Sequence, residues 1–188
     1  LLDQYDAKAA TEVEEIEQTV DRYEDRLGAY LLQVSALHLS EYESKEVSKL
    51  LYSIGDFERI SDHAVNLTEV AQELHTKSIG FSPEAQVETS TMRAAVKEIM
   101  ALTVKVFDTN NQELARKVEP LEEVVDVLRE TIKANHIERL RTGTYTIELG
   151  FVLSDLLTNL ERISDHCSNI AVNVMEQTGR GGLESHAY

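Results

Sequence analysis

The hexapeptide Glu-Arg-Ile-Ser-Asp-His occurs twice in this chain, at Glu58–His63 and again at Glu161–His166. Two copies of one charged hexapeptide in a chain of 188 residues indicate a duplicated structural unit. Further residues match on both sides of the hexapeptide at the same offset of 103, and residues of the preceding segment match at an offset of 105, as Glu17 does with Glu122. The sequence therefore predicts two tandem copies of one unit.

Composition and apolar spacing predict that the unit is helical. The chain has 8 Gly and 2 Pro, and its apolar residues recur at steps of three and four. We expect an all-α fold with five helices, two in a first repeat over residues 1–78 and three in a second repeat over residues 84–178. The first repeat lacks the leading helix that the second has, and the chain begins without Met, so we expect a piece of a longer protein. Residues 179–188 are rich in Gly and Ser and are expected to be flexible.

Short signals mark the helix ends. Ser40 followed by Glu43 has the form of a capping box. Pro83 after Ser82 is typical of a first helical position. Gly143 marks a turn before the last helix, and Pro120 either kinks the helix expected from about residue 112 to 140 or lies in its first turn.

Net charge limits the kinds of partner. Lys and Arg number 18 against 34 Asp and Glu, a net charge of −16, which argues against nucleic acid and anionic lipid but permits cations. No apolar run approaches the roughly 20 residues that span a bilayer. The single cysteine, Cys167, excludes a disulfide framework. We interpret it as a small helix-packing residue.

Four Glu-x-x-x-Asp pairs are the candidate functional groups. Spacing of four places both carboxylates of a pair on one helical face. Within each repeat, the two helices on either side of the turn carry one pair each, and the register of an antiparallel hairpin brings the two pairs to one level on one flank. The pairs are Glu17 and Asp21, Glu58 and Asp62, Glu122 and Asp126, and Glu161 and Asp165.

Two interpretations of these carboxylates remain open. Clustered carboxylates repel one another unless cations neutralise them, and oxygen ligands suit Mg²⁺, Ca²⁺, Mn²⁺ and ferric iron. The alternative is a solvated acidic flank with Arg59 and Arg162 as counter-ions. His63 and His166 lie on the opposite flank of their helices and are not expected to share ligands with the carboxylates of their own hairpin.

Other side chains add less. We interpret His63 and His166 as making a surface hydrogen bond or a contact with the third helix. Asn66 and Asn169 follow one turn beyond the carboxylates and offer a neutral oxygen there. The chain has no glycine-rich phosphate loop and no nucleophile elbow, so we do not expect an enzyme.

The stretches Asp56–Leu67 and Asn159–Ile170 resemble the signatures of the phosphate-uptake regulator (PhoU) family, with Ser61 and Ser164 where the family commonly has Gly. The resemblance covers nearly the whole chain and implies tandem three-helix units. It also implies that the eight carboxylates bind metal, with iron, Mn, Mg, Ca or Zn as the candidate ions.

The resemblance implies a regulatory function in phosphate transport. The segment Leu39–Leu67 looks more like the cytoplasmic domain fused to sodium/phosphate cotransporters, at the inner face of the cell membrane. Its partner is then the membrane portion of the same chain or another phosphate transporter or signalling protein, and we expect a homo-oligomer. The alternatives are a free-standing cytoplasmic regulator and a structural oligomerisation module that binds no metal.

Overall fold

A computed structural model describes residues 1–143 and 145–178, and these residues form only helices and the turns between them. The predicted all-α fold is confirmed. The expected flexible tail, residues 179–188, lies outside the described residues. The helices are α1 (Ala7–Ser35), α2 (Glu41–Lys77), α3 (Pro83–Thr109), α4 (Gln112–Ala115), α5 (Val118–Arg141) and α6 (Ile147–Thr178).

Helices α2 and α3 begin at the residues that the sequence signals predicted. The Ser40 amide donates to Glu43 Oε2 at 2.8 Å and the Glu43 amide donates to Ser40 Oγ at 3.3 Å, which completes the capping box of α2. Pro83 is the first residue of α3, and Gly143 has a positive φ of 71° in the turn between α5 and α6. The two hairpins, α1–α2 and α5–α6, therefore turn at the predicted residues.

One predicted helix is divided. The segment expected as one helix from about residue 112 to 140 forms the short α4 and then α5. Pro120 lies in the first turn of α5, where its missing N–H needs no partner, whereas in a continuous helix its ring would clash with the carbonyl of Arg116. Of the two predicted positions for Pro120, the first-turn position is the one observed.

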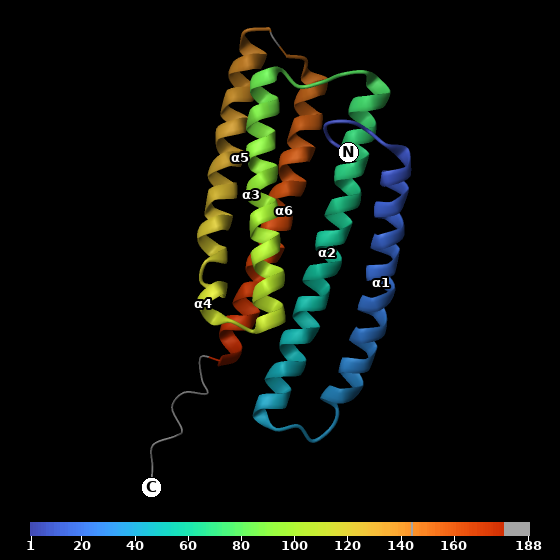
Figure 1. Cartoon of the computed structure of the whole chain (residues 1–188), viewed down its shortest axis with the longest axis vertical. Coiled ribbons are helices and arrows are strands. Elements are labelled where there is room, and N and C mark those ends of the chain that lie inside the picture. The colour runs from blue at the N-terminus through green and yellow to red at the C-terminus, as the bar shows by residue number, and fades with distance from the viewer. Residues whose placement is uncertain (144, 179–188) are drawn as a thin grey trace.

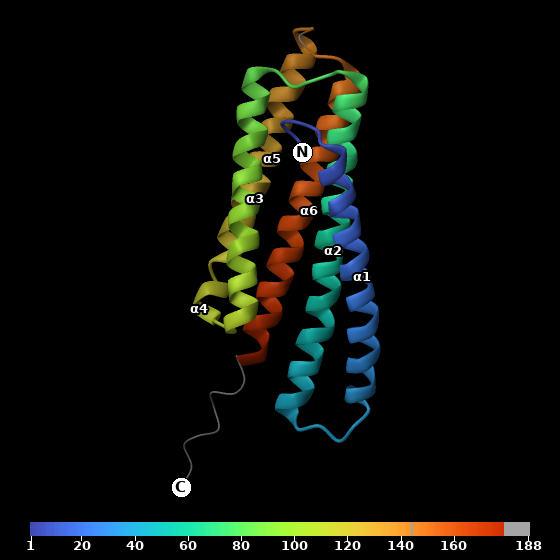
Figure 2. The same ribbon diagram turned by 45° about the vertical axis from the view of Figure 1, so that its right-hand side comes forward.

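The helices form an elongated bundle in which α2 and α6 lie side by side in the middle (Figure 1). Helices α3 and α5 pack against α6, and α1 packs against α2 and against no other helix of the described residues. Figure 2 shows the same arrangement from the side, with α1 at one edge and α3 and α5 at the other. The second repeat is thus a closed three-helix unit and the first is an open pair.

The main core reflects this difference. Its buried residues come from α2 through α6 in the described part of the chain, and α1 contributes none. No described helix combines the length and the apolar content that a membrane crossing requires. The carboxylate pairs thus lie on two helical hairpins, and only the first hairpin includes a helix, α1, that adds no buried residue to the main core.

Candidate functional site

The carboxylates of the first hairpin lie along the flank between α1 and α2. Glu17, Glu58 and Asp62 are half-buried and Asp21 is exposed. Burial raises the pKa of Glu58, and the neighbouring charges of Asp62 and Glu24 raise it further. Glu24, one turn beyond Asp21 on α1, was not predicted as part of this group. The first hairpin thus holds a crowded set of acids that includes Glu24.

A single arginine partly neutralises this group. Arg59 Nε lies 3.5 Å from Glu58 Oε2, and its Nη1 lies 3.7 Å from Asp62 Oδ2. The Arg59 side chain is itself mostly exposed, so water screens these contacts and they add little stability. Arg59 therefore acts as the predicted counter-ion, but its charge does not offset burial and the neighbouring acids, which together keep the pKa of Glu58 raised.

The second hairpin repeats the arrangement. Burial raises the pKa of Glu122, with further contributions from Asp126 and Asp165. The influence of Asp165 on Glu122 agrees with the predicted register, which puts these two residues at one level on facing helices. Arg162 lies 3.3 Å from Asp165 and 3.8 Å from Glu161, as Arg59 does in the first hairpin. The two copies of the carboxylate group are built alike to this point.

The copies differ at one position that the sequence analysis missed. Arg129 Nη1 lies 3.6 Å from Glu161 Oε1 and 3.2 Å from Glu130 Oε1. At the offset of 105 between α1 and α5, Arg129 is the counterpart of Glu24. The second group therefore contains a cation where the first contains another acid. The offset was visible in the sequence and, extended by one turn, could have identified both residues.

The eight predicted metal ligands do not form a preformed metal-binding site in the described residues. Within residues 1–143 and 145–178, no three His, Cys, Asp or Glu side chains converge as a metal ion requires. The carboxylates run along the hairpin flanks, and their role as ligands stays a prediction. The donor set fits a hard cation in its chemistry, since carboxylate oxygens are the ligands that such cations prefer and neighbouring acids contribute to the raised pKa of Glu58 and Glu122 after burial.

The two signature histidines meet between the repeats. The rings of His63 and His166 stack with centroids 5.8 Å apart, where α2 packs against α6. His63 Nδ1 lies 2.8 Å from Asn159 Oδ1, and His166 Nδ1 lies 2.9 Å from Asp56 Oδ1. Because both acceptors are oxygens, Nδ1 is the protonated nitrogen in each ring. As predicted, the histidines do not join the carboxylates of their own hairpins. The contact is with the last helix of the other repeat, however, and not with the third helix.

The two asparagines make hydrogen bonds across the repeats that the sequence did not predict. Asn66 Nδ2 donates to Asn159 Oδ1 at 3.0 Å, and Asn169 Nδ2 donates to Asp56 Oδ1 at 3.3 Å. The amide nitrogens of these side chains complete the histidine cluster, and the predicted use of their oxygens beside the carboxylates stays a prediction. The reason is that α2 and α6 approach each other on this flank, which the spacing within one helix does not reveal. Asp56 and Asn159 are themselves counterparts at the offset of 103.

Replacing Asp56 by alanine should destabilise the protein by about 1–3 kcal/mol, because His166 and Asn169 both lose their acceptor at a half-buried position. Asp56→Asn is the matched control, since Asn159 performs the same function in the other copy. We expect urea unfolding to show a much smaller loss for the asparagine variant. Equal losses for the two variants would contradict this function of the acceptor oxygen.

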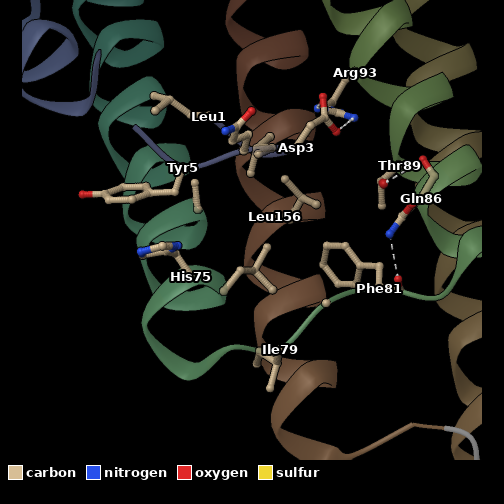
Figure 3. A pocket seen from close by; sticks show the side chains of 15 residues that line it. Leu1, Asp3, Tyr5, His75, Ile79, Phe81, Gln86, Thr89, Arg93 and Leu156 are labelled. Carbon is tan, nitrogen blue, oxygen red and sulfur yellow. Dashed lines mark hydrogen bonds and ion pairs between the residues drawn. The ribbon is translucent and has the colours of Figure 1, made fainter. Parts of the chain in front are cut away.

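A cavity lies beside the first residues of the chain, between α2 and α3 (Figure 3). This cavity of about 480 Å³ has Arg93 and Thr89 of α3 on one side and His75 of α2 on the other. Asp3 binds Arg93 through two contacts of 2.7 and 3.0 Å, and Tyr5 stacks on His75. The guanidinium is therefore already paired within the chain.

Cys167 lies in the core with 1% of its surface exposed, which confirms its predicted packing role. Burial raises the pKa of its thiol to about 11, so the reactive thiolate is not formed at neutral pH.

Comparison with protein families gives one match that covers most of the chain. The model of the PhoU domain family matches residues 1–71 and 89–174. Phosphate-specific transport system accessory protein PhoU homolog 1 of Thermotoga maritima is 28% identical over 130 residues, which are 69% of this chain and 55% of the relative. The homologue of Deinococcus radiodurans is 26% identical over 164 residues, 87% of this chain and 76% of the relative. The chain thus spans about half the length of the Thermotoga relative.

Two solved structures have the same fold. PhoU from Pseudomonas aeruginosa superposes with a TM-score of 0.85 at 23% identity, covering 92% of this chain and 82% of that one. The phosphate transport system regulatory protein PhoU from Streptococcus pneumoniae gives a TM-score of 0.80 at 16% identity, with coverages of 92% and 80%. At these identities the likeness is one of fold.

Proposed function

Because the chain belongs to the PhoU domain family, we propose that it is a non-enzymatic regulator of phosphate transport that acts by contact with a transporter or signalling protein. The observation that carries the proposal is the match to relatives named accessory proteins of phosphate-specific transport systems, over 69% and 87% of this chain. The acidic surface, with its net charge of −16, favours a protein partner over nucleic acid or anionic lipid.

A finer question is whether the chain is a separate protein or a domain fused to a cotransporter. The predicted cotransporter tail at the inner face of the membrane rests on the resemblance of Leu39–Leu67, with the missing Met and the incomplete first repeat, whereas the relatives carry the names of transport accessory proteins. We therefore favour a cytoplasmic regulator that is separate from the transporter. The size of the endogenous protein on an immunoblot distinguishes the two, because a fused cotransporter is far larger than 21.2 kDa.

The regulatory proposal can be tested in the native host. Deleting the coding region for residues 1–178 should change the rate of labelled phosphate uptake, or its dependence on external phosphate. Supplying the chain from a plasmid should restore the parental behaviour. Unchanged uptake at both low and high external phosphate would overturn the proposal.

We further propose that the carboxylate groups bind a hard metal cation, such as iron, Mn, Mg or Ca. Burial raises the pKa of Glu58 and Glu122, and neighbouring carboxylates raise it further; that repulsion favours a cation at these positions. The hairpins should differ in affinity, because Glu24 adds negative charge to the first group while Arg129 neutralises part of the second. The first hairpin is the stronger candidate.

Asp62→Asn should weaken Mn²⁺ binding by about tenfold or more, since a charged oxygen ligand is lost. Asp108→Asn, an equal change at an exposed acid of α3, should have no effect. Arg129→Glu should strengthen binding at the second hairpin. Isothermal titration calorimetry with Mn²⁺ measures all three. A parent protein that binds no Mn²⁺ or ferric ion would overturn the metal proposal without affecting the regulatory one.

A further inference from the structure

A pocket of about 510 Å³ lies where the first hairpin meets the second repeat. Glu24 of α1, Asp56 and Glu58 of α2 and His166 of α6 are among the residues that line it. Helix α2 lies between α1 and α6, so three helices contribute to this pocket (Figure 1). Sites for small molecules have volumes of about 300–1,000 Å³. The pocket therefore has the size of a small-molecule site.

The pocket lies on the flank of the hairpin that faces the other repeat. Asp56 in its wall binds His166 of α6. In the second repeat, Glu88 of α3 binds Arg139 of α5, which is the counterpart of Val34 on α1. Val34 does not line the pocket. The pocket thus lies away from the flank that α3 covers in the closed repeat, and helices of the described chain form its walls.

The missing side chain of Gly55 keeps this pocket open. Gly55 lies in the interior of α2, where glycine is less favourable than alanine because it loses more conformational freedom. Among the described residues, a Cβ at this position would meet no atom within 4 Å, so close packing does not require the glycine. What the glycine provides is room in the pocket.

The lining is rich in hydrogen-bond acceptors. It contains three carboxylates, and Arg59 is the one arginine or lysine among its described residues. Arg59 also contacts Asp62, at 3.7 Å, so its charge is shared. His166 donates through Nδ1 to Asp56, which leaves Nε2 as the acceptor of the neutral ring. A ligand with positive charge and several N–H donors complements such a lining.

The acids of the pocket form two groups. Glu24 and Glu58 lie on the flank between α1 and α2, close enough for their charges to interact. Asp56 lies where α2 meets α6. Tyr52 and Val172, which expose 68% and 41% of their surface, add an aromatic face and an aliphatic contact. The lining therefore combines two separate negative groups with apolar surface.

We infer that this pocket binds a linear aliphatic diamine or polyamine. One ammonium group donates to Asp56 and to Nε2 of His166, and a second is held by Glu24 and Glu58. The methylene chain between them passes over Gly55, where a side chain would obstruct it.

Other contacts favour an organic cation over a bare metal ion. No three His, Cys, Asp or Glu side chains of the described residues converge as a metal ion requires. A flexible amine instead reaches groups that lie apart. The ring of Tyr52 attracts an ammonium group, and Val172 packs against methylene groups.

The second repeat does not contain the same site. The counterparts of Glu24, Gly55 and Asp56 are Arg129, Thr158 and Asn159. A cation and an added side chain therefore replace an acid and open space, and we expect one ligand per chain. The inference is independent of the regulatory proposal and shares only Glu58 with the metal proposal.

Isothermal titration calorimetry of the whole chain with spermidine tests the site. In EDTA and about 150 mM salt, which screens exposed charges, the parent should bind one spermidine. Gly55→Val should weaken binding by about tenfold or more, because its side chain obstructs the pocket without changing the charge. Glu24→Arg, which copies the second repeat, should weaken it as well. Thr158→Val is the matched control at the equivalent position and should bind as the parent does.

Two results would overturn the inference. One is a parent that binds no spermidine, which leaves the regulatory and metal proposals intact. The other is equal binding by the parent and Gly55→Val, because a general attraction to the net charge of −16 does not sense a neutral side chain. Butylamine, with a single ammonium group, should bind about tenfold more weakly than spermidine. Equal affinity for the two amines would contradict recognition by two acidic groups.

Discussion

Gly150→Val should destabilise the protein by about 3 kcal/mol, because the new side chain has no room. A Cβ at position 150 would lie 2.7 Å from Nε2 of His136. The imidazole cannot move away easily, since it is 8% exposed and packs edge-on against Tyr145. Urea unfolding of the variant and its parent measures the loss. Gly55→Val is the control, because a Cβ there meets nothing within 4 Å.

The internal repeat provides a rescue for this variant. The counterparts of His136 and Gly150 in the first repeat are Leu31 and Val47, both of which are buried. The equivalent space between the two helices of a hairpin is therefore filled by an imidazole beside glycine in the second repeat and by two aliphatic side chains in the first. The double variant His136→Leu/Gly150→Val should recover most of the stability that Gly150→Val loses. A double variant no more stable than Gly150→Val would contradict this account.

The double variant should also be less sensitive to acid. Burial lowers the pKa of His136 below 6.5, with a smaller contribution from Arg139. Both ring nitrogens are buried without a hydrogen-bond partner. Because the unfolded chain binds a proton more readily at this residue, stability is fully present above about pH 6.5 and is lost as the pH falls. Replacing His136 by leucine removes this loss.

Leu157→Ala should cost about 3 kcal/mol and lower Tm by about 10 °C, because Leu157 has no exposed surface and its loss leaves a cavity. Ile54→Ala, the equivalent change on α2, should cost only about 1 kcal/mol, since Ile54 is only partly buried. Thermal melts of both variants and the parent measure the losses.

The difference is expected because α3 of the same chain covers Leu157, whereas no such helix of the described residues covers Ile54. Equal costs for the two variants would contradict this difference between the repeats.

Residue spacing and capping signals predicted the hairpin turns and the helices, apart from the break between α4 and α5. The capping residues around Ser40 and Pro83 act through neighbours within one helical turn, so their effect is local and readable in the sequence. The offset between the repeats also set the register that puts Glu122 level with Asp165. These features depend on contacts within a helix or across one short turn.

Tertiary structure decided which flanks meet. The sequence placed Asn66 and Asn169 beside the carboxylates, yet the packing of α2 on α6 joins them to Asp56 and Asn159. It also brought Glu24 to one carboxylate group and Arg129 to the other. Helical periodicity fixes the face on which a side chain lies, but the helix that covers this face is set by association of distant segments. The sequence predicted that the first repeat lacks a helix, but only the tertiary structure showed which residues of α1 and α2 this leaves exposed.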